Sequence, residues 1–459
     1  MKNYLQRYET ILWLIIKSIV YLSLMFIFII VLGKGNIGLT RLSRTLGVTI
    51  VTFCVTGLLF LSVYGKYDIG RRKSKPIINS LLLAVFFTDA ITYLVVMIMR
   101  INVPNIRAFR LNGLGLLFLA FVIQILVIII FTYAGNSLFF KIHKPEECCI
   151  ITSSQKSLNK IVYVIQKFRK QYEIVSVVDY HSDQLENEVK KVQTVFVYDV
   201  PAEIRSKIMR WSYEHKINVY FNPEIEDVME TNAVHYVLDD VYLLNKIVKS
   251  LTMEQRILKR LLDIGLSLIL GILSAPLWIG GMIAIKLEDG GPVIFKQKRA
   301  TIRGRLFDVY KLRTMKVNSK NYSATKDDDR ITKAGKILRR TRIDELPQLY
   351  NVLKGDMSFV GPRPEMIENV EAYEEQLPEF KYRLRMKAGL TGYAQITGKY
   401  NTTPKDKLLM DMMYIEQFSI WRDIQLIFQT AIVLLKSDST EAFDENKLMN
   451  QYKFEEWKK

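Results

Sequence analysis

Four long apolar segments near the N-terminus constrain the fold of this 459-residue chain more than any other feature. They cover residues 11–32, 46–64, 77–99 and 114–133. Each is long enough to cross a hydrocarbon core of ~30 Å. The first segment is longer than the apolar part of a signal peptide and lacks a small-residue cleavage site. The sequence therefore predicts an α-helical membrane domain with four transmembrane spans over residues 1–140.

Basic residues beside these spans predict their orientation. Nine Lys or Arg flank the side that holds both ends of the domain, and six flank the other side. Because cytoplasmic loops carry the excess of positive charge, we expect both ends in the cytoplasm. Lys17 and Asp89 lie inside spans, where a charge is costly and a functional role is the default interpretation. Lys17 is close enough to a span end to reach the interface, whereas the sequence names no partner for Asp89.

Residues 145–250 alternate between short β-rich runs and charged helical runs. The expected strands are 148–153, 172–180, 194–200 and 217–222, with helices at 157–170 and 202–215. Such alternation predicts a Rossmann-like α/β domain with a parallel sheet covered on both faces. Its first turn, 153–160, contains no glycine to admit a pyrophosphate, so a spacer or oligomerisation module fits better than a dinucleotide site. Three cysteines, two of them adjacent, make no disulfide framework and favour a reducing compartment.

A fifth apolar segment, 259–286, has Pro276 near its middle and basic residues on both flanks. Both flanks thus qualify as cytoplasmic, which a straight crossing cannot satisfy. A helix that is broken at the proline, enters the membrane and returns satisfies both, so we predict a re-entrant helix hairpin. The alternative is a fifth crossing that places the rest of the chain outside.

The following segment, 296–342, holds 16 Lys or Arg against 4 Asp. Part of this charge is expected to attract anionic lipid head groups. Lys311 and Arg313 lie two residues apart in a strand-like run and so project to one face, which favours phosphate binding. RNA binding would need an aromatic platform, and none has suitable spacing. The Gly- and Thr-rich segment 387–401 is interpreted as a substrate-facing loop, with an ordinary cluster of turns as the alternative.

An adjacent carboxylate pair, Asp344 and Glu345, follows three arginines. Pro347 suits the first turn of a helix. We therefore expect Asp344 to be the N-cap of a helix over 345–353 that stops at Gly355. The N-cap position and the arginines would keep the Asp344 carboxylate ionised. Two acids beside guanidinium groups describe a site for a metal-bound polyphosphate, and a capped surface helix with salt bridges is the alternative. Neither His nor Cys follows residue 252, so chemistry there must use carboxylates, hydroxyls, amines or a metal.

Several sequence blocks in one order carry a resemblance to a known family. They are the KR–LLD opening at 259–263, GPVIFKQKR, FDVYKLRTM, RIDELPQLYNVLKGDMSFVGPRP and AGLTGYAQITG. Over about 259–435 the chain resembles the bacterial sugar transferases called polyprenyl-phosphate sugar-1-phosphate transferases, in the large form with four N-terminal spans that starts exopolysaccharide or capsule synthesis. The family's helix often breaks at Ser-Pro, where this chain has Ala275-Pro276, so Ser274 would have to supply the hydroxyl.

The resemblance implies a membrane-associated α/β catalytic domain over 252–436, followed by a tail at 437–459. It implies transfer of a sugar 1-phosphate, glucose or galactose, from a UDP-sugar to undecaprenyl phosphate with release of UMP. Asp344 would be the nucleophile, and Glu345 would hold Mg²⁺ with it or accept a proton. The phosphate- and substrate-binding candidates are Lys298, Arg299, Lys311, Arg313, Arg342, Arg363, Thr391 and Gln395.

The resemblance also places the protein in a bacterial cytoplasmic membrane with its catalytic domain on the cytoplasmic face. We expect a homo-oligomer, specifically a dimer, with the lipid bilayer and other polysaccharide-assembly proteins as partners, and no nucleic acid. Two alternatives stay open: a non-catalytic membrane scaffold for polysaccharide assembly, and a metal-dependent nucleotide-sugar hydrolase.

Overall fold

The computed structural model describes residues 9–100, 111–246, 248, 250–317, 328–398 and 403–435. The expected tail at 437–459 lies outside the described residues. Contacts divide the described residues into two units, one that ends at Asn222 and one that begins at Pro223. This division differs from the boundary expected near residue 250, because the segment from residue 223 packs within the second unit.

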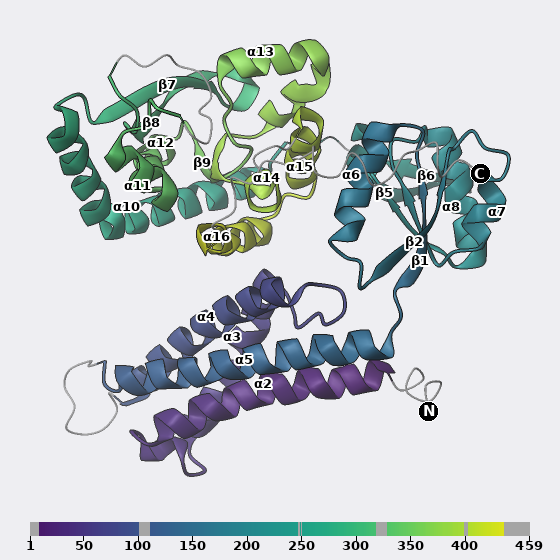
Figure 1. The fold of residues 1–459 in the computed structure, drawn as a ribbon. Helices are drawn as coiled ribbons and strands as arrows, with labels where there is room; N and C mark the ends of the chain where they lie inside the picture. Colours follow the sequence, from purple (N-terminus) through teal and green to yellow (C-terminus); the bar gives the residue numbers. More distant parts are fainter. Residues whose placement is uncertain are drawn as a thin grey trace. The chain divides into compact units, whose positions relative to one another are not determined.

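The N-terminal unit begins with four apolar helices (Figure 1): α2 (Glu9–Gly33), α3 (Arg44–Tyr64), α4 (Ser74–Arg100) and α5 (Leu114–Ile142). They pack through a core that includes Leu24, Phe28, Phe53, Leu81 and Ile128. The predicted helical, apolar region is confirmed. Together with α10 below, five helices among the described residues are long and apolar enough to span a membrane.

Asp89 gains a partner that the sequence could not name. Its side chain on α4 is 2 % exposed, and its Oδ1 lies 3.3 Å from Nε2 of Gln124 on α5, which also donates to the Leu24 carbonyl. The pair therefore links three helices of the bundle through polar contacts.

The α/β part of this unit is a parallel sheet in the order β2-β1-β3-β4. Its strands are β1 (Glu146–Ile151), β2 (Tyr172–Val178), β3 (Thr194–Val197) and β4 (Asn218–Phe221), and its helices are α6 (Gln155–Gln166), α7 (Leu185–Lys190) and α8 (Ala202–His215). Side chains alternate between two cores. Cys148 joins the core with Leu158 of α6, and Cys149 the core with Ile208 of α8. The expected parallel sheet with two covered faces is confirmed, and all three cysteines are free.

The C-terminal unit opens with α9 (Ile225–Glu230), the hairpin β5 (Val234–Leu238) and β6 (Val241–Asn245), and α10 (Met253–Asp289). An antiparallel pair follows, β7 (Ile294–Ala300) and β8 (Leu306–Leu312), with the turn η2 (Ile302–Gly304) between them. The remaining elements are α11 (Lys333–Thr341), η3 (Ile343–Glu345), α12 (Gln348–Lys354), β9 (Ser358–Val360), α13 (Ile367–Gln376), η4 (Pro378–Arg385), β10 (Gly389–Thr391), α14 (Tyr393–Thr397), α15 (Pro404–Glu416) and α16 (Ile420–Leu435).

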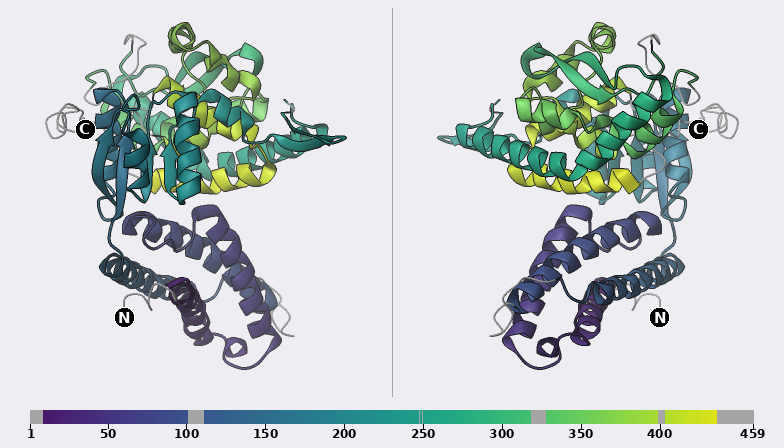
Figure 2. Two further views of the ribbon diagram at one scale, coloured as in Figure 1. Left: turned by 90° about the vertical axis from the view of Figure 1, so that its right-hand side faces the viewer. Right: turned by 90° about the vertical axis from the view of Figure 1, so that its left-hand side faces the viewer.

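Both ends of α10 pack on this unit while its middle is exposed. Near its start, Asp263 accepts hydrogen bonds from the Phe359 amide (2.8 Å) and the Ser358 hydroxyl (3.0 Å) of β9. Near its end, Gly281 lies against Leu312 and Leu338. Large apolar side chains between these contacts are exposed, such as Ile272 (73 %) and Leu273 (71 %). Figure 2 shows α10 beside α16, which it also contacts.

The helix expected to break at Pro276 is continuous by its backbone hydrogen bonds, since α10 runs through the proline from Met253 to Asp289. Two residues before the proline, the Ser274 hydroxyl donates to the Leu270 carbonyl at 2.6 Å. Such bonding back to the preceding turn commonly bends a helix. Ser274 thus supplies the hydroxyl that Ala275 lacks.

A parallel pairing of β9 with β10 holds the loop that follows β9. A Cβ on Gly389 would lie 2.1 Å from the Gly361 nitrogen, and one on Gly392 would lie 2.2 Å from the Gly361 oxygen. No other residue fits at either position, because a Cβ contact below 3.0 Å forces the backbone apart. These two glycines of the 387–401 segment therefore allow the backbone at Gly361 to pack closely against them. They fix the start of Gly361-Pro362-Arg363-Pro364.

Candidate active site

The carboxylate pair lies in a short 3₁₀ turn between two helices. α11 ends at Arg342, whose φ of 55° is left-handed, and η3 turns through Asp344 and Glu345 before α12 begins at Gln348. The expected N-cap position of Asp344 is therefore wrong, since Arg342 precedes η3 and Pro347 is the residue before α12. The expected end of the helix at Gly355 is confirmed, with φ of 94°.

Basic side chains from three parts of the chain contact the Glu345 carboxylate. Its Oε1 lies 2.7 Å from Nη2 of Arg363 and 3.3 Å from Nζ of Lys311 on β8. Its Oε2 lies 3.9 Å from Nη1 of Arg342. Burial alone would raise the pKa of the Glu345 carboxyl, but Arg363, Lys311 and Arg342 together hold that pKa well below its usual range. Glu345 is thus a permanently ionised anchor for the cations.

Asp344 is the carboxylate left without such partners. Among the described residues no hydrogen bond to its side chain is formed. Burial, and then the neighbouring charge of Glu345, raise the pKa of the Asp344 carboxyl to about 6, against the opposing effect of Lys311 and Arg339. A pKa of about 6 still leaves the carboxylate largely ionised at neutral pH, as expected, although Asp344 is no N-cap and the nearby cations do not outweigh burial and the charge of Glu345. A half-buried carboxylate with lone pairs available at neutral pH is suited to act as a nucleophile or a metal ligand.

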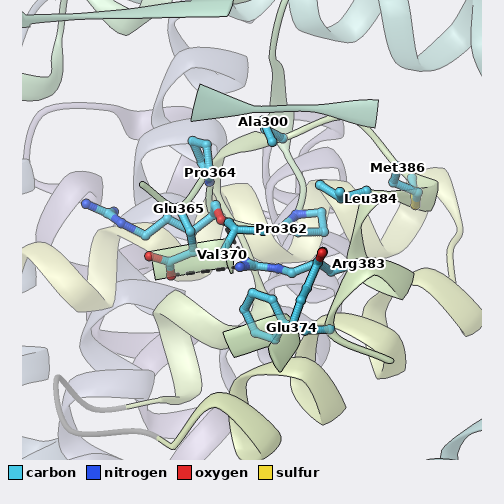
Figure 3. Close-up of a pocket in the computed structure, with 12 residues that line it drawn as sticks. Ala300, Pro362, Pro364, Glu365, Val370, Glu374, Arg383, Leu384 and Met386 are labelled. Atoms are coloured by element: carbon cyan, nitrogen blue, oxygen red, sulfur yellow. Dashed lines mark hydrogen bonds and ion pairs between the residues drawn. The ribbon is translucent and has the colours of Figure 1, made fainter. Parts of the chain in front are cut away.

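Arg363 is held in place by a residue that the sequence did not reveal. Arg383 is 4 % exposed, donates to the Arg363 carbonyl at 2.7 Å and lies 2.7 Å from Oδ2 of Asp411. Figure 3 shows Arg383 and Glu365 lining a small pocket beside the Pro362 and Pro364 loop. No motif marks Arg383, and only its burial and contacts disclose the role.

The other candidates differ in their distance from this cluster. Arg299 adjoins it, since its guanidinium donates to the Pro364 carbonyl at 3.1 Å, and burial lowers its pKa to about 10. Lys298 is exposed on β7. Arg313 instead pairs with Asp289 at the end of α10, with Nη1 and Oδ2 2.7 Å apart.

The last two candidates lie on β10 and α14. The Thr391 hydroxyl is 2.8 Å from that of Thr430, and the buried Gln395 Nε2 has no hydrogen-bond partner among the described residues. The structure thus gathers Asp344, Glu345, Lys311, Arg342 and Arg363. It places Arg313 and Thr391 in contacts with other residues, and it shows no contact of Gln395 with this cluster.

A metal ion would find two protein carboxylates here. No group of three or more His, Cys, Asp or Glu that could hold a metal occurs in the described part of the chain. Two carboxylates alone do not complete a metal site, so an ion such as Mg²⁺ would have to take its other ligands from substrate phosphates and water.

Comparison with known proteins gives the family. Residues 254–437 match the model of the family described as bacterial sugar transferase. A UDP-glucose:undecaprenyl-phosphate glucose-1-phosphate transferase of Caulobacter vibrioides is 41% identical over 189 residues, which are 39% of this chain and 71% of that protein. The chain belongs to the bacterial sugar transferase family.

Other relatives of this family are longer than the matched part. An Escherichia coli protein with the same name is 39% identical over 217 residues, 45% of this chain and 47% of that protein. A galactosyl transferase of Streptococcus agalactiae is 43% identical over 199 residues, 39% of this chain and 42% of that protein. The chain thus covers less than half of these two relatives. The predicted membership in this enzyme family is confirmed, and the matched residues contain the whole Asp344–Glu345 cluster.

Proposed function

We propose that this protein transfers a sugar 1-phosphate from a UDP-sugar to undecaprenyl phosphate and releases UMP, as the first membrane step of exopolysaccharide or capsule synthesis. The observation that carries the proposal is the unequal pair in η3. Glu345 is neutralised by cations, whereas Asp344 keeps a free carboxylate beside them. Relatives named for transfer of glucose or galactose to this lipid support the substrates, and glucose or galactose is the proposed sugar.

The reaction would proceed in two displacements on one carboxylate. An oxygen of Asp344 attacks the β-phosphorus of the donor, the bond from that phosphorus to the bridging oxygen breaks, and UMP leaves with the electron pair. An oxygen of the lipid phosphate then attacks the same phosphorus and frees Asp344. Splitting the exchange in this way allows a soluble donor and a lipid acceptor to use one site in turn.

The cations would stabilise the charge that spreads over the transferring phosphoryl group. Arg363 and Lys311 already converge on Glu345, and charge placed in advance costs no reorganisation during the reaction. Bound Mg²⁺, held by Asp344 and Glu345, would supply further neutralisation of the donor diphosphate. Glu345 is alternatively placed to accept the proton of the lipid phosphate.

The proposed membrane placement rests on α10. Its two ends pack on the same unit and its middle exposes apolar side chains, which supports a re-entrant helix that enters and leaves the cytoplasmic leaflet. The catalytic unit would then face the cytoplasm, where nucleotide sugars are made, in the cytoplasmic membrane. The sheet order and its two covered faces likewise support a Rossmann-like fold for residues 146–221.

Release of UMP with and without undecaprenyl phosphate tests the proposed function. A transferase turns over only when lipid is added, and the proposed two-step route also releases about one UMP per enzyme without lipid. A metal-dependent hydrolase turns over without lipid, and a scaffold releases no UMP under either condition. Either of the last two results would contradict the proposal. A panel of UDP-sugars in the same assay identifies the sugar.

A further inference from the structure

The hairpin β5–β6 is an apolar surface on both faces. All ten of its strand residues are exposed. On one face Leu238 pairs with Val241 and Tyr236 with Leu243, and on the other Val237 pairs with Tyr242. A two-stranded hairpin with no covered face is marginal in water. Exposed apolar surface of this kind marks an interaction site.

Polar contacts join the two ends of the hairpin to α15. Asn232 donates to the Glu416 carbonyl, and Nζ of Lys246 lies 2.6 Å from Oε2 of Glu416 on α15. Arg385 also reaches that carboxylate at 3.0 Å. Two cations therefore share one anion at the base, which leaves a positive charge there.

A membrane is the wrong partner for this surface. The turn at the tip consists of Asp239 and Asp240, and two carboxylates are costly in hydrocarbon and repelled by anionic lipid. Both strands also have an open edge, and open sheet edges do not occur within the hydrocarbon region. The partner is therefore a protein.

We propose that the partner is the same hairpin of a second copy of this chain, paired antiparallel through β6. In a two-residue hairpin the pair next to the turn, Leu238 and Val241, is hydrogen-bonded, so Tyr242 and Leu244 turn their backbone groups to the free edge. A two-fold axis at Leu243 places Tyr242 of one copy opposite Leu244 of the other. The backbones of these two residues then exchange two N–H···O hydrogen bonds. The two hairpins then form one four-stranded sheet.

Charge selects this register and this strand. When Leu243 faces itself, Asp240 at the tip of one hairpin lies opposite Lys246 at the base of the other, which is the end with excess positive charge. The equivalent pairing through β5, centred on Tyr236, would place Asp240 opposite Asn232 instead. The edge of β6 also lacks the lysine, proline or bulge that protects edge strands from addition.

Single cysteine substitutions in the full-length protein, which can cross-link two copies, test the proposal in native membrane vesicles. The background carries Cys54→Ser, since Cys54 is exposed while Cys148 and Cys149 are buried. Leu243→Cys would meet its own copy across a non-hydrogen-bonded pair at a Cα separation of about 4.5 Å, within disulfide range. Tyr236→Cys is the matched control, because it shares the face of Leu243 and would lie about 14 Å from its copy at three strand spacings.

Mild oxidation followed by a non-reducing gel gives the readout. We expect Leu243→Cys to form a dimer that a reductant reverses, at least tenfold more than Tyr236→Cys. A dimer from Tyr236→Cys alone would show pairing through β5. Equal dimer from both would show collision or packing of faces, and no dimer from either would show that this hairpin does not meet itself. Each of these three results overturns the proposal.

Discussion

At the scale of single residues, the different protonation of two neighbouring carboxyls is the feature with most consequence. The pKa of the Asp344 carboxyl is raised to about 6 because the side chain is partly removed from solvent and lies beside the charged Glu345. Its carboxylate is therefore ionised above pH 6 and protonated below. If the ionised form is the nucleophile, single-turnover release of UMP should fall about tenfold per pH unit below pH 6.

The variant Glu345→Gln should move this acid limb to lower pH, because it removes the negative charge that raises the pKa of Asp344 and leaves Lys311 and Arg363 to act on it. The pH dependence of the single-turnover rate is the measurement. Glu371→Gln, an exposed change on α13, is the matched control and should leave the limb in place. An unchanged limb in Glu345→Gln would contradict the assignment of the limb to Asp344.

Two arginines from the same candidate list should behave differently. Arg363 contacts Glu345 at the carboxylate pair, whereas Arg313 contacts Asp289 and the Pro292 carbonyl. We expect Arg363→Met to lower kcat by roughly 10²-fold, as for loss of one preorganised charge. Arg313→Met should lower Tm and change kcat little, because it leaves the Asp289 carboxylate without the Arg313 guanidinium. Loss of turnover at unchanged Tm in Arg313→Met would support the original phosphate-binding assignment instead.

At the scale of elements, the local sequence pattern predicted the helices and strands that depend on neighbouring residues. It failed for features that depend on contacts between residues far apart in the sequence. The spans and the strands 148–153 and 194–200 follow from hydrophobic period and length, and the structure has them as α2 to α5, β1 and β3. The turn η3 was missed because Arg342 takes a left-handed conformation between α11 and η3, which the capping pattern at Asp344 does not indicate. Likewise, Arg383 lies 20 residues from Arg363 in the sequence, and no local pattern joins them.

The hairpin β5–β6 shows a second reason for failure. Its turn is Asp239-Asp240, with Asp239 at φ 55°, where a glycine or asparagine is the usual signal. Within the carboxylate cluster, Arg342, Asp344 and Glu345 stand in one short motif, whereas Lys311 was predicted from its spacing on a strand and Arg363 only from the family resemblance. Thr391 and Gln395 could not be placed in the same way, since no charge pattern tells which side of a loop faces a substrate.

The path of α10 through the membrane is a prediction at the same scale. Cysteines at Glu254 and Gln297, before and after the helix, should both resist an impermeant thiol reagent applied outside the cell. Leu42→Cys, in the connection between α2 and α3, should be labelled if both ends of the four-helix domain are cytoplasmic. The background again carries Cys54→Ser. Labelling of Gln297→Cys but not Glu254→Cys would show a complete crossing and would contradict the re-entrant path.

At the scale of the whole molecule, the catalytic unit begins earlier than the family match. Ile225 and Val228 of α9 are buried in one core with Phe380 and Leu408, and Nζ of Lys405 lies 2.5 Å from Oε2 of Glu224. Because all site residues follow Lys259, a chain that begins at Pro223 should retain transferase activity in lipid.

A chain that begins at Thr252 should be less stable, because it exposes this core at about 1.5–3 kcal/mol for each large apolar side chain. Thermal unfolding and UMP release of both truncated chains are the measurements. A well-folded protein from Pro223 with no activity would show that the N-terminal unit contributes to the site. Equal Tm for the two truncations would contradict the placement of α9.

The central claim is that Asp344 carries a phospho-sugar ester between the two substrates, and isotope exchange tests it most directly. Labelled UMP is incubated with UDP-sugar and the full-length enzyme without any undecaprenyl phosphate. A covalent intermediate predicts that label enters UDP-sugar, and that Asp344→Asn abolishes this exchange while Glu345→Gln retains a slow rate. A direct transfer requires both substrates together, so absence of exchange until lipid is added, by an enzyme that turns over once lipid is present, would contradict the claim.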